Sequence, residues 1–142
     1  MTLMLDTTAL LARYLDGPFR PIVLAAMATD HDWCASALAL SEALMLIDQI
    51  GDDPDRADHL RRTVRDDWER IHVVPVDQRC LDRASELGRT QPLRTVDALH
   101  LAAADRLPRP VRFVTFDPGQ IPVAMALGFD VISTEAERPK GF

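Results

Sequence analysis

Short apolar runs alternate along this chain with longer stretches in which apolar residues recur at helical spacing. Residues 3–5 (Leu-Met-Leu) form such a run, and an acid closes it, which is typical of a short buried strand. Further along, Leu60, Val64, Trp68 and Ile71 follow the i, i+4, i+8, i+11 spacing of one helical face. This alternation predicts an α/β domain with a mainly parallel sheet.

Local capping and stop signals place the ends of the predicted elements. Thr7 or Thr8 is expected to cap the first helix, and Ser36 a later one, because hydroxyl side chains accept hydrogen bonds from free backbone N–H groups. Gly51 and Gly128 are expected to end helices. The expected strands cover residues 3–5, 33–35, 72–76, 112–115 and 130–132, and the expected helices cover residues 8–15, 19–29, 37–50, 52–71, 77–87, 94–107 and 120–127.

Four acidic residues lie in apolar surroundings near the predicted strand ends and helix starts: Asp6, Glu42, Asp97 and Asp117. A lone carboxylate buried there without a partner costs several kcal/mol, so such acids are usually paired, metal-bound or functional. In parallel sheets, ligands bind beyond the carboxyl ends of the strands. If the four junctions meet there, the acids form an oxygen-ligand site for a hard divalent cation, which suits phosphodiester chemistry.

Each acid also has a simpler structural explanation. Asp6 could cap a helix, Asp97 could be a helix-start acid, and Asp117 could open an Asx-Pro turn. The helix around Glu42 is almost wholly apolar, so we expect it to be buried nearly all round, with Glu42 facing a partner or a metal rather than water. His100, one helical turn after Asp97, is expected to be structural rather than a catalytic base.

Length and charge narrow the classes of protein further. A chain of 142 residues predicts a single domain spanning residues 1–142, with a mobile tail from about residue 137. The net charge of −6 argues against a general polyanion binder, but a nuclease stays open because bound metal cancels local negative charge. The longest apolar run, residues 22–28, is too short to span a membrane, and no leader pattern opens the chain. We therefore expect a cytoplasmic protein with no membrane partner.

The acidic segments resemble a known family when they are taken together and in order. Residues 5–10 (LDTTAL), 41–43 (SEA), 97–103 (DALHLAA) and 114–117 (VTFD) are similar to the four ordered motifs of PIN-domain ribonucleases. The similarity is greatest to the VapC toxins of VapBC toxin–antitoxin modules, and it spans nearly the whole chain. The segment Asp-Ala-Leu-His-Leu-Ala is the most distinctive of the four.

This resemblance implies a three-layer α/β/α fold with a five-stranded parallel sheet. It implies an acidic site that binds Mg²⁺, or Mn²⁺ as a substitute, and cleaves single-stranded RNA by means of a metal-activated water. Asp6 and Asp97 are expected to bind the metal directly, and Glu42 and Asp117 either directly or through water. The expected supporting residues are Thr7 or Thr8 beside Asp6, Thr115 as a polar neighbour, and Arg94 as a phosphate contact.

The resemblance also implies protein partners, namely a cognate VapB-type antitoxin and assembly as a homodimer or a toxin–antitoxin hetero-oligomer. Two other functions stay open: an RNA-processing PIN nuclease without a toxin role, and a catalytically silent PIN-like domain that binds RNA or protein. The presence of all four acids argues against the silent domain. A receiver domain is disfavoured, because the only lysine of the chain is Lys140.

Overall fold

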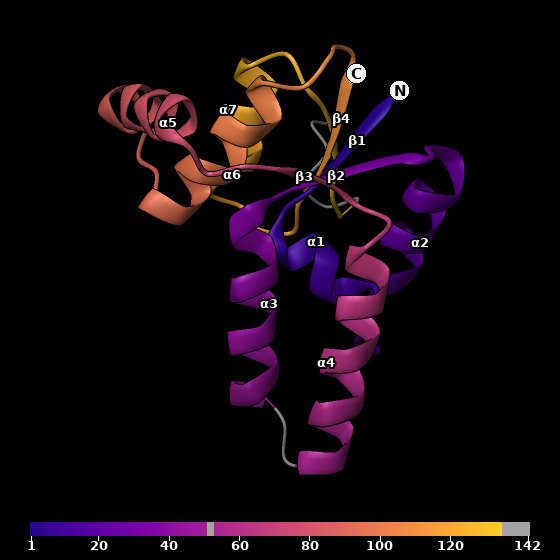
Figure 1. Ribbon diagram of the computed structural model, residues 1–142. Helices are drawn as coiled ribbons and strands as arrows, with labels where there is room; N and C mark the ends of the chain where they lie inside the picture. The colour runs from indigo at the N-terminus through magenta and orange to yellow at the C-terminus, as the bar shows by residue number, and fades with distance from the viewer. Residues whose placement is uncertain (51–52, 135–142) are drawn as a thin grey trace.

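The computed structural model describes residues 1–50 and 53–134, and a five-stranded sheet lies at the centre of this part of the chain. Figure 1 shows the sheet between helices, with two long helices extending beyond one of its edges. All neighbouring strands are parallel, in the order β3-β2-β1-β4-β5. The strands are β1 (Thr2–Leu5), β2 (Asp32–Ser36), β3 (His72–Val74), β4 (Val111–Val114) and β5 (Asp130–Ile132).

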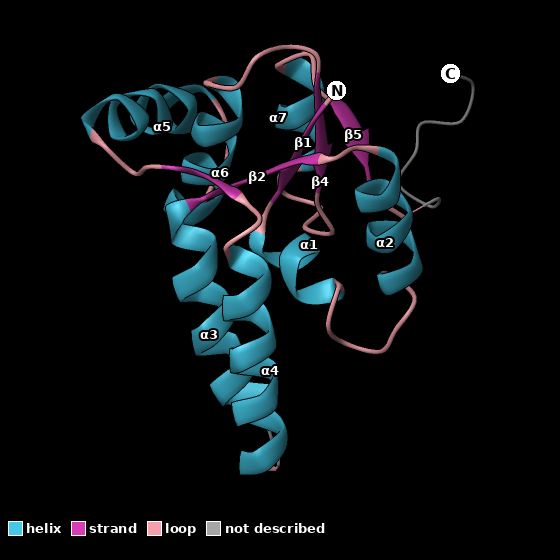
Figure 2. Cartoon of the chain, turned by 45° about the vertical axis from the view of Figure 1, so that its right-hand side comes forward, coloured by secondary structure: helices cyan, strands magenta, loops and turns pink. Residues whose placement is uncertain are grey.

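Helices cover both faces of the sheet, as Figure 2 shows. They are α1 (Thr7–Ala12), α2 (Arg20–Thr29), α3 (Ala37–Ile50), α4 (Pro54–Trp68), α5 (Gln78–Thr90), α6 (Thr95–Asp105) and α7 (Ile121–Ala126). Met4 and Phe113 pack with α5, α6 and α7 on one face. Leu3 and Leu5 pack with α1 and α2 on the other, where Ala35 packs with α3 and α4. The three-layer α/β/α fold with a parallel sheet is therefore confirmed.

The strand order creates a crevice at the carboxyl edge of the sheet. From β1 the chain moves outward through β2 and β3, and then returns to the other side of β1 as β4. Met4 lies opposite both Cys34 and Phe113, so β1 has a partner on each side. The reversal of order next to β1 is a topological switch point, where ligands bind in open α/β sheets. Asp6 follows β1 directly at this point.

The first helix differs from its prediction in its cap and its length. Asp6, rather than Thr7 or Thr8, caps α1, and its side chain accepts a hydrogen bond from the backbone N–H of Ala9. The helix ends at Ala12 instead of residue 15, because the N–H groups of Arg13 and Tyr14 bond to oxygens three residues back. The predicted helix stop at Gly51 and the mobile tail from about residue 137 lie outside the described residues.

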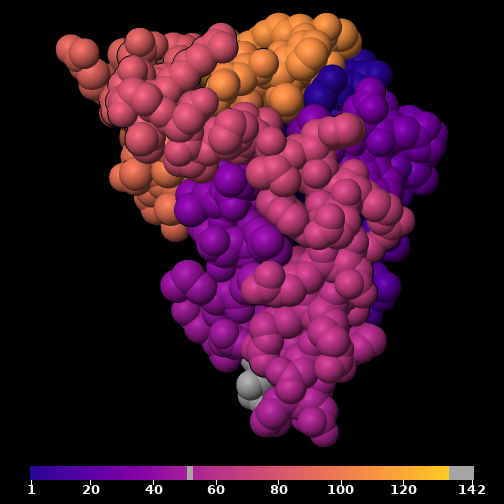
Figure 3. Space-filling model, in the orientation of Figure 1, coloured from indigo at the N-terminus to yellow at the C-terminus, as the bar shows by residue number. Residues whose placement is uncertain are grey.

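The expectation that α3 is buried nearly all round is wrong. Only Ala39, Ala43 and Ile47 are buried, whereas Met45 is 63% exposed. The reason is that α3 extends past the sheet, where α4 and α1 cover it on one side only. Figure 3 shows α3 and α4 forming the narrow lower half of the molecule. The apolar stripe predicted for α4 does pack against α3, through Leu60, Val64, Trp68 and the following Ile71.

The two cysteines are free thiols in the core, as predicted. Burial raises the pKa of Cys34 to about 11, with a smaller contribution from the nearby Asp32. A thiol with such a pKa stays protonated at neutral pH and is a poor nucleophile. Among the described residues, no helix is long and apolar enough to span a membrane.

A cluster around Asp67 joins α4 to α1. Asp67 Oδ2 accepts hydrogen bonds from Tyr14 Oη at 2.9 Å and Arg13 Nε at 3.2 Å, and Oδ1 pairs with Arg70. The guanidinium groups of Arg13 and Arg70 each lie 5.7 Å from a ring centroid of Trp33. Partial burial raises the pKa of Asp67, but the hydrogen bonds from Tyr14, Arg70 and Arg13 outweigh it and lower the pKa overall. The cluster therefore stabilises the contact between α1 and α4 through the ionised carboxylate.

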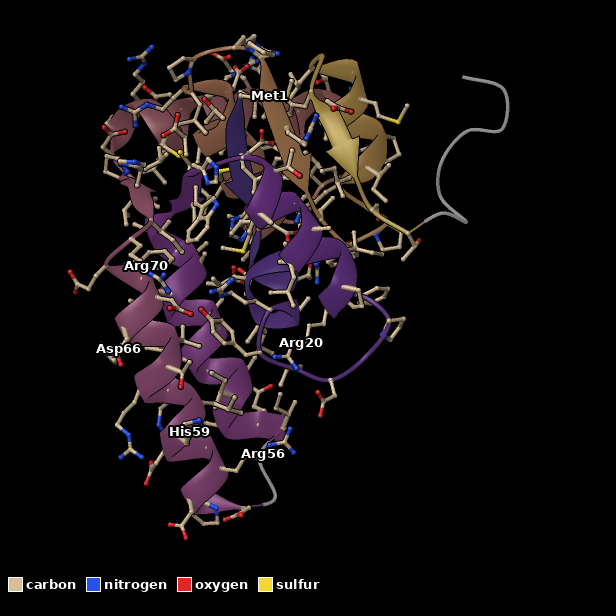
Figure 4. The ribbon with its side chains drawn as sticks, turned by 90° about the vertical axis from the view of Figure 1, so that its right-hand side faces the viewer. Met1, Arg20, Arg56, His59, Asp66 and Arg70 are labelled. Carbon is tan, nitrogen blue, oxygen red and sulfur yellow. The ribbon has the colours of Figure 1, made fainter. Side chains whose placement is uncertain are left out.

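We predict that Asp67→Asn lowers the free energy of unfolding by about 2 kcal/mol at pH 7. An acid whose pKa is lowered by folding stabilises the protein above its unfolded pKa, and this contribution is lost as pH falls through the folded pKa. The difference between the wild type and the variant should therefore shrink below about pH 4. Asp66→Asn is the matched control, because Asp66 lies on the outer side of α4 (Figure 4). Urea unfolding that gave Asp67→Asn wild-type stability at pH 7 would contradict the prediction.

Candidate active site

Asp6 is fully buried at the carboxyl end of β1 and is held by four uncharged donors. Its Oδ1 accepts hydrogen bonds from Ala9 N at 2.8 Å and Thr8 Oγ1 at 2.7 Å. Its Oδ2 accepts from Thr115 Oγ1 at 2.6 Å and Gln120 Nε2 at 3.2 Å. Burial raises the pKa of Asp6, and the hydrogen bonds offset this only in part. The four donors therefore fix the position of the Asp6 carboxylate.

Asp97 lies in the first turn of α6, where it is buried and shares a donor with Asp6. Gln120 Nε2 donates to Asp97 Oδ1 at 3.0 Å as well as to Asp6, so one amide nitrogen joins the two carboxylates. Arg94, the residue that precedes α6, donates from Nε to Asp97 Oδ2 at 2.9 Å. Asp6 and Asp97 are far apart in the sequence, but both contact Gln120.

Asp117 is connected to the same group through Arg94. Arg94 Nη2 donates to Asp117 Oδ2 at 2.7 Å, and the arginine side chain is 76% exposed. Asp117 Oδ1 also accepts a hydrogen bond from Gly119 N at 2.9 Å, which is the Asx turn that the sequence left open as an alternative. Asp117 therefore stabilises the turn with one oxygen and contacts Arg94 with the other.

Glu42 belongs to a second group of contacts, which it forms with Thr7 and His100. Glu42 Oε1 accepts a hydrogen bond from Thr7 Oγ1 at 2.6 Å and lies 2.7 Å from His100 Nε2. Burial alone raises the pKa of Glu42, but the hydrogen bonds from His100 and Thr7 outweigh it and lower the pKa. His100 is buried and holds Glu42, as its predicted structural role requires. Of the two threonines, Thr8 contacts Asp6 and Thr7 contacts Glu42.

The four acids are not gathered around one point. Gln120 and Arg94 link Asp6, Asp97 and Asp117 in a row, whereas Glu42 contacts Thr7 and His100. Among residues 1–50 and 53–134, no three His, Cys, Asp or Glu side chains lie close enough to hold a metal ion by themselves. Asp6 and Asp97 do fit a hard cation, because both are buried carboxylates in contact with the same nitrogen. Mg²⁺ commonly takes one or two protein carboxylates and keeps several waters, so this pair could hold the ion together with waters.

Gln120 is the site residue that sequence reasoning missed. The sequence predicts Gln120 only as the start of the last helix. In the structure it is buried and contacts both Asp6 and Asp97. Its Oε1 has no hydrogen-bond partner within the described part of the chain. The available signal was a lone amide between the turn at Asp117 and the apolar start of α7.

Comparisons with known proteins agree with this fold. A family profile described as PIN domain matches residues 3–126. Ribonuclease VapC46 of Mycobacterium tuberculosis is 31% identical over 130 residues, which cover 91% of this chain and 95% of that protein. FitAcB of Neisseria gonorrhoeae has a similar structure, with a TM-score of 0.72 at 15% identity, covering 92% of this chain and 96% of that chain. DNA-bound VapBC of Salmonella typhimurium gives 0.68 at 18% identity, with coverage of 94% and 98%. The chain therefore belongs to the PIN-domain family, and along most of its length it is similar to a VapC-type member.

Proposed function

We propose that this protein is a divalent-metal-dependent endoribonuclease that cleaves single-stranded RNA and acts as the toxin of a toxin–antitoxin pair. The observation that carries the proposal is the pair of buried carboxylates, Asp6 and Asp97, joined by one amide nitrogen at the switch point of the sheet. The 31% identity to a protein named as a ribonuclease supports it.

Asp6 and Asp97 would hold Mg²⁺, or Mn²⁺ in its place, with Glu42 and Asp117 assisting through water. A bound metal would polarise the scissile phosphate and lower the pKa of a water that acts as the nucleophile. The burial that raises the pKa of Asp6 supports this assignment, because a neighbouring cation favours the ionised form of a buried carboxylate. Glu42 is already favoured in its ionised form by His100 and Thr7.

The remaining residues of the site position the acids. Thr8 and Thr115 donate one hydrogen bond to each oxygen of Asp6, which fixes the plane of the carboxylate. Arg94 keeps Asp97 and Asp117 together, and its exposed guanidinium is the cation in this group best placed to meet an RNA phosphate. Arginine suits this role, because its planar set of donors matches two phosphate oxygens.

The proposal includes a cognate VapB-type antitoxin and assembly as a homodimer or toxin–antitoxin hetero-oligomer in the cytoplasm. It is supported by solved structures with a similar fold. They include a toxin-antitoxin complex from Klebsiella pneumoniae, with a TM-score of 0.67 at 16% identity, covering 84% of this chain and 90% of that chain. A small reading frame beside the gene would support the toxin role, and its absence would favour an RNA-processing nuclease.

The test is cleavage of a mixed cellular RNA pool by the purified protein, free of antitoxin. We expect discrete products with Mg²⁺ or Mn²⁺, no products with EDTA, and recovery when excess Mg²⁺ is added back. Asp6→Asn, purified in the same way, is the control for contaminating ribonucleases, because it changes a carboxylate of the site and any products that it still gives with Mg²⁺ point to another enzyme. Cleavage that EDTA leaves unchanged would contradict the metal role. A folded protein that cuts no RNA would favour the silent binding domain.

A further inference from the structure

An exposed aromatic ring lies on a second ring at the edge of the candidate active site. Phe19 stacks on Phe116 with ring centroids 4.3 Å apart and an interplanar angle of 7°. Phe116 is nearly buried and packs with Leu5 and Val23 in the apolar cluster on this face of the sheet. Phe19, by contrast, is 37% exposed although Phe116 covers one of its faces. A rigid inner ring thus presents an outer ring to solvent.

The backbone ties this aromatic pair to the acidic group. Phe116 lies between Thr115 and Asp117, and its backbone N–H donates to Thr8 Oγ1 at 2.9 Å. The same Thr8 hydroxyl donates to Asp6. The end of α2 leads into the beginning of β2, which lies at the amino edge of the parallel sheet. The start of α2, where Phe19 lies, is therefore toward the carboxyl edge. Phe116 is therefore next to Asp117 in the sequence, and its backbone contacts the same hydroxyl that contacts Asp6.

An arginine follows the exposed ring directly in the sequence. Arg20 follows Phe19 and begins α2, where Figure 4 labels it next to the loop that leads into the helix. Its ion pair with Asp16, at 3.2 Å, joins two exposed side chains. Such surface pairs contribute little and exchange readily with another anion. Arg20 is thus free to contact a phosphate without breaking a buried interaction.

We propose that Phe19, supported by Phe116 and flanked by Arg20, is a stacking subsite for an unpaired base of the RNA next to the scissile phosphate. This inference rests on the proposed function and adds the chemistry by which the substrate is held. Proteins that bind single-stranded nucleic acid combine aromatic rings for the bases with cations for the backbone. An acidic protein with a net charge of −6 gains little from general attraction to RNA, so a stacking contact of this kind supplies local affinity.

The subsite predicts that one base of the substrate and Phe19 act as a pair. We would take a short RNA that the wild type cleaves and replace its nucleotides one at a time by abasic ones. We expect one position near the cut where the abasic RNA lowers kcat/KM of the wild type about 10-fold, chiefly by raising KM. Phe19→Ala should show the same loss with intact RNA and no further loss with the abasic RNA.

Further variants separate stacking from apolar packing. Phe19→Trp should keep wild-type kcat/KM, because it keeps a stacking face, and Phe19→Leu should behave like Phe19→Ala. Leu24→Ala is the matched control, since Leu24 is on α2 with a similar exposure of 38% and is not part of the ring pair. Arg20→Gln should weaken binding at every RNA position alike and reduce the salt dependence of KM. Melting temperatures of all variants show whether the fold is retained.

The outcomes separate this inference from the function on which it rests. If the wild type cleaves no RNA with metal present, the proposed function fails. If it cleaves RNA but Phe19→Leu equals the wild type, the exposed ring serves apolar packing or a protein partner, and the stacking subsite is ruled out. Equal sensitivity of the wild type and Phe19→Ala to every abasic position also overturns it.

Discussion

Asp6→Asn and Asp97→Asn are each expected to lower kcat/KM for RNA cleavage about 10³-fold, equivalent to about 4 kcal/mol of transition-state stabilisation. Each substitution removes one of the two charged ligands that the site offers to the metal, and it replaces one accepting oxygen by an NH2 donor. Asparagine at position 6 keeps the oxygen that caps α1, while the Thr115 hydroxyl and the Gln120 amide can turn to accept from the new NH2 group. The loss should therefore arise from chemistry rather than unfolding.

Stability measurements on Asp6→Asn provide a check that needs no activity. The pKa of Asp6 is raised by folding, so the wild-type protein binds this proton more tightly when folded. Its contribution to stability is greatest at low pH and falls as pH rises through the raised pKa. Near pH 8 without metal, Asp6→Asn should be at least as stable as the wild type. Added Mg²⁺ or Mn²⁺ should raise the melting temperature of the wild type and not that of the variant.

One result would count against this assignment, and another would make the test uninformative. Near-wild-type cleavage by both variants under Mg²⁺ would remove Asp6 and Asp97 from the reaction. A cooperative unfolding transition lost in either variant would show that the acid is needed for the fold, and inactivity would then carry no information about catalysis. Asp66→Asn should match the wild type in both assays, because Asp66 is exposed on the outer side of α4, away from the acidic group.

Gln120→Ala is expected to weaken metal binding and lower cleavage by 10- to 100-fold, the range found when groups that orient metal ligands are removed. Gln120 Nε2 contacts both Asp6 and Asp97, at 3.2 and 3.0 Å. Without it, the two carboxylates lose the donor that holds them close, and they should move apart. Excess Mg²⁺ should recover part of the activity, since the ligands themselves remain.

The measurement for Gln120 is the Mg²⁺ concentration at half-maximal cleavage, together with the shift in melting temperature that Mn²⁺ produces. Gln78→Ala is the matched control, because Gln78 Nε2 also donates to a carboxylate, that of Asp82 at 2.8 Å, but on the exposed surface of α5. Identical Mg²⁺ dependence in Gln120→Ala and the wild type would show that the amide only fills space in the core.

The order and type of the elements could be predicted from local chemistry. The apolar runs, the helical stripe on α4, the Ser36 hydroxyl that accepts from Leu38 N, and Gly128 with its positive φ of 85° all act over a few residues. The acids stood out for a similar reason, because charges within apolar segments are costly. The cap of α1 was mistaken, since Asp6 and both threonines are acceptable capping residues and only their three-dimensional partners distinguish them.

The partners of each acid depend on the order of the parallel strands. Asp6 meets Thr115 and Gln120 across more than a hundred residues, and Glu42 meets His100 across 58. These contacts follow from placing β4 beside β1 in one register, which a single sequence does not reveal. The same holds for the exposed side of α3 and for Phe19 lying on Phe116. Local patterns specify which segments form and which side chains are costly to bury, whereas packing between distant segments specifies what those side chains touch, because that contact depends on the whole fold.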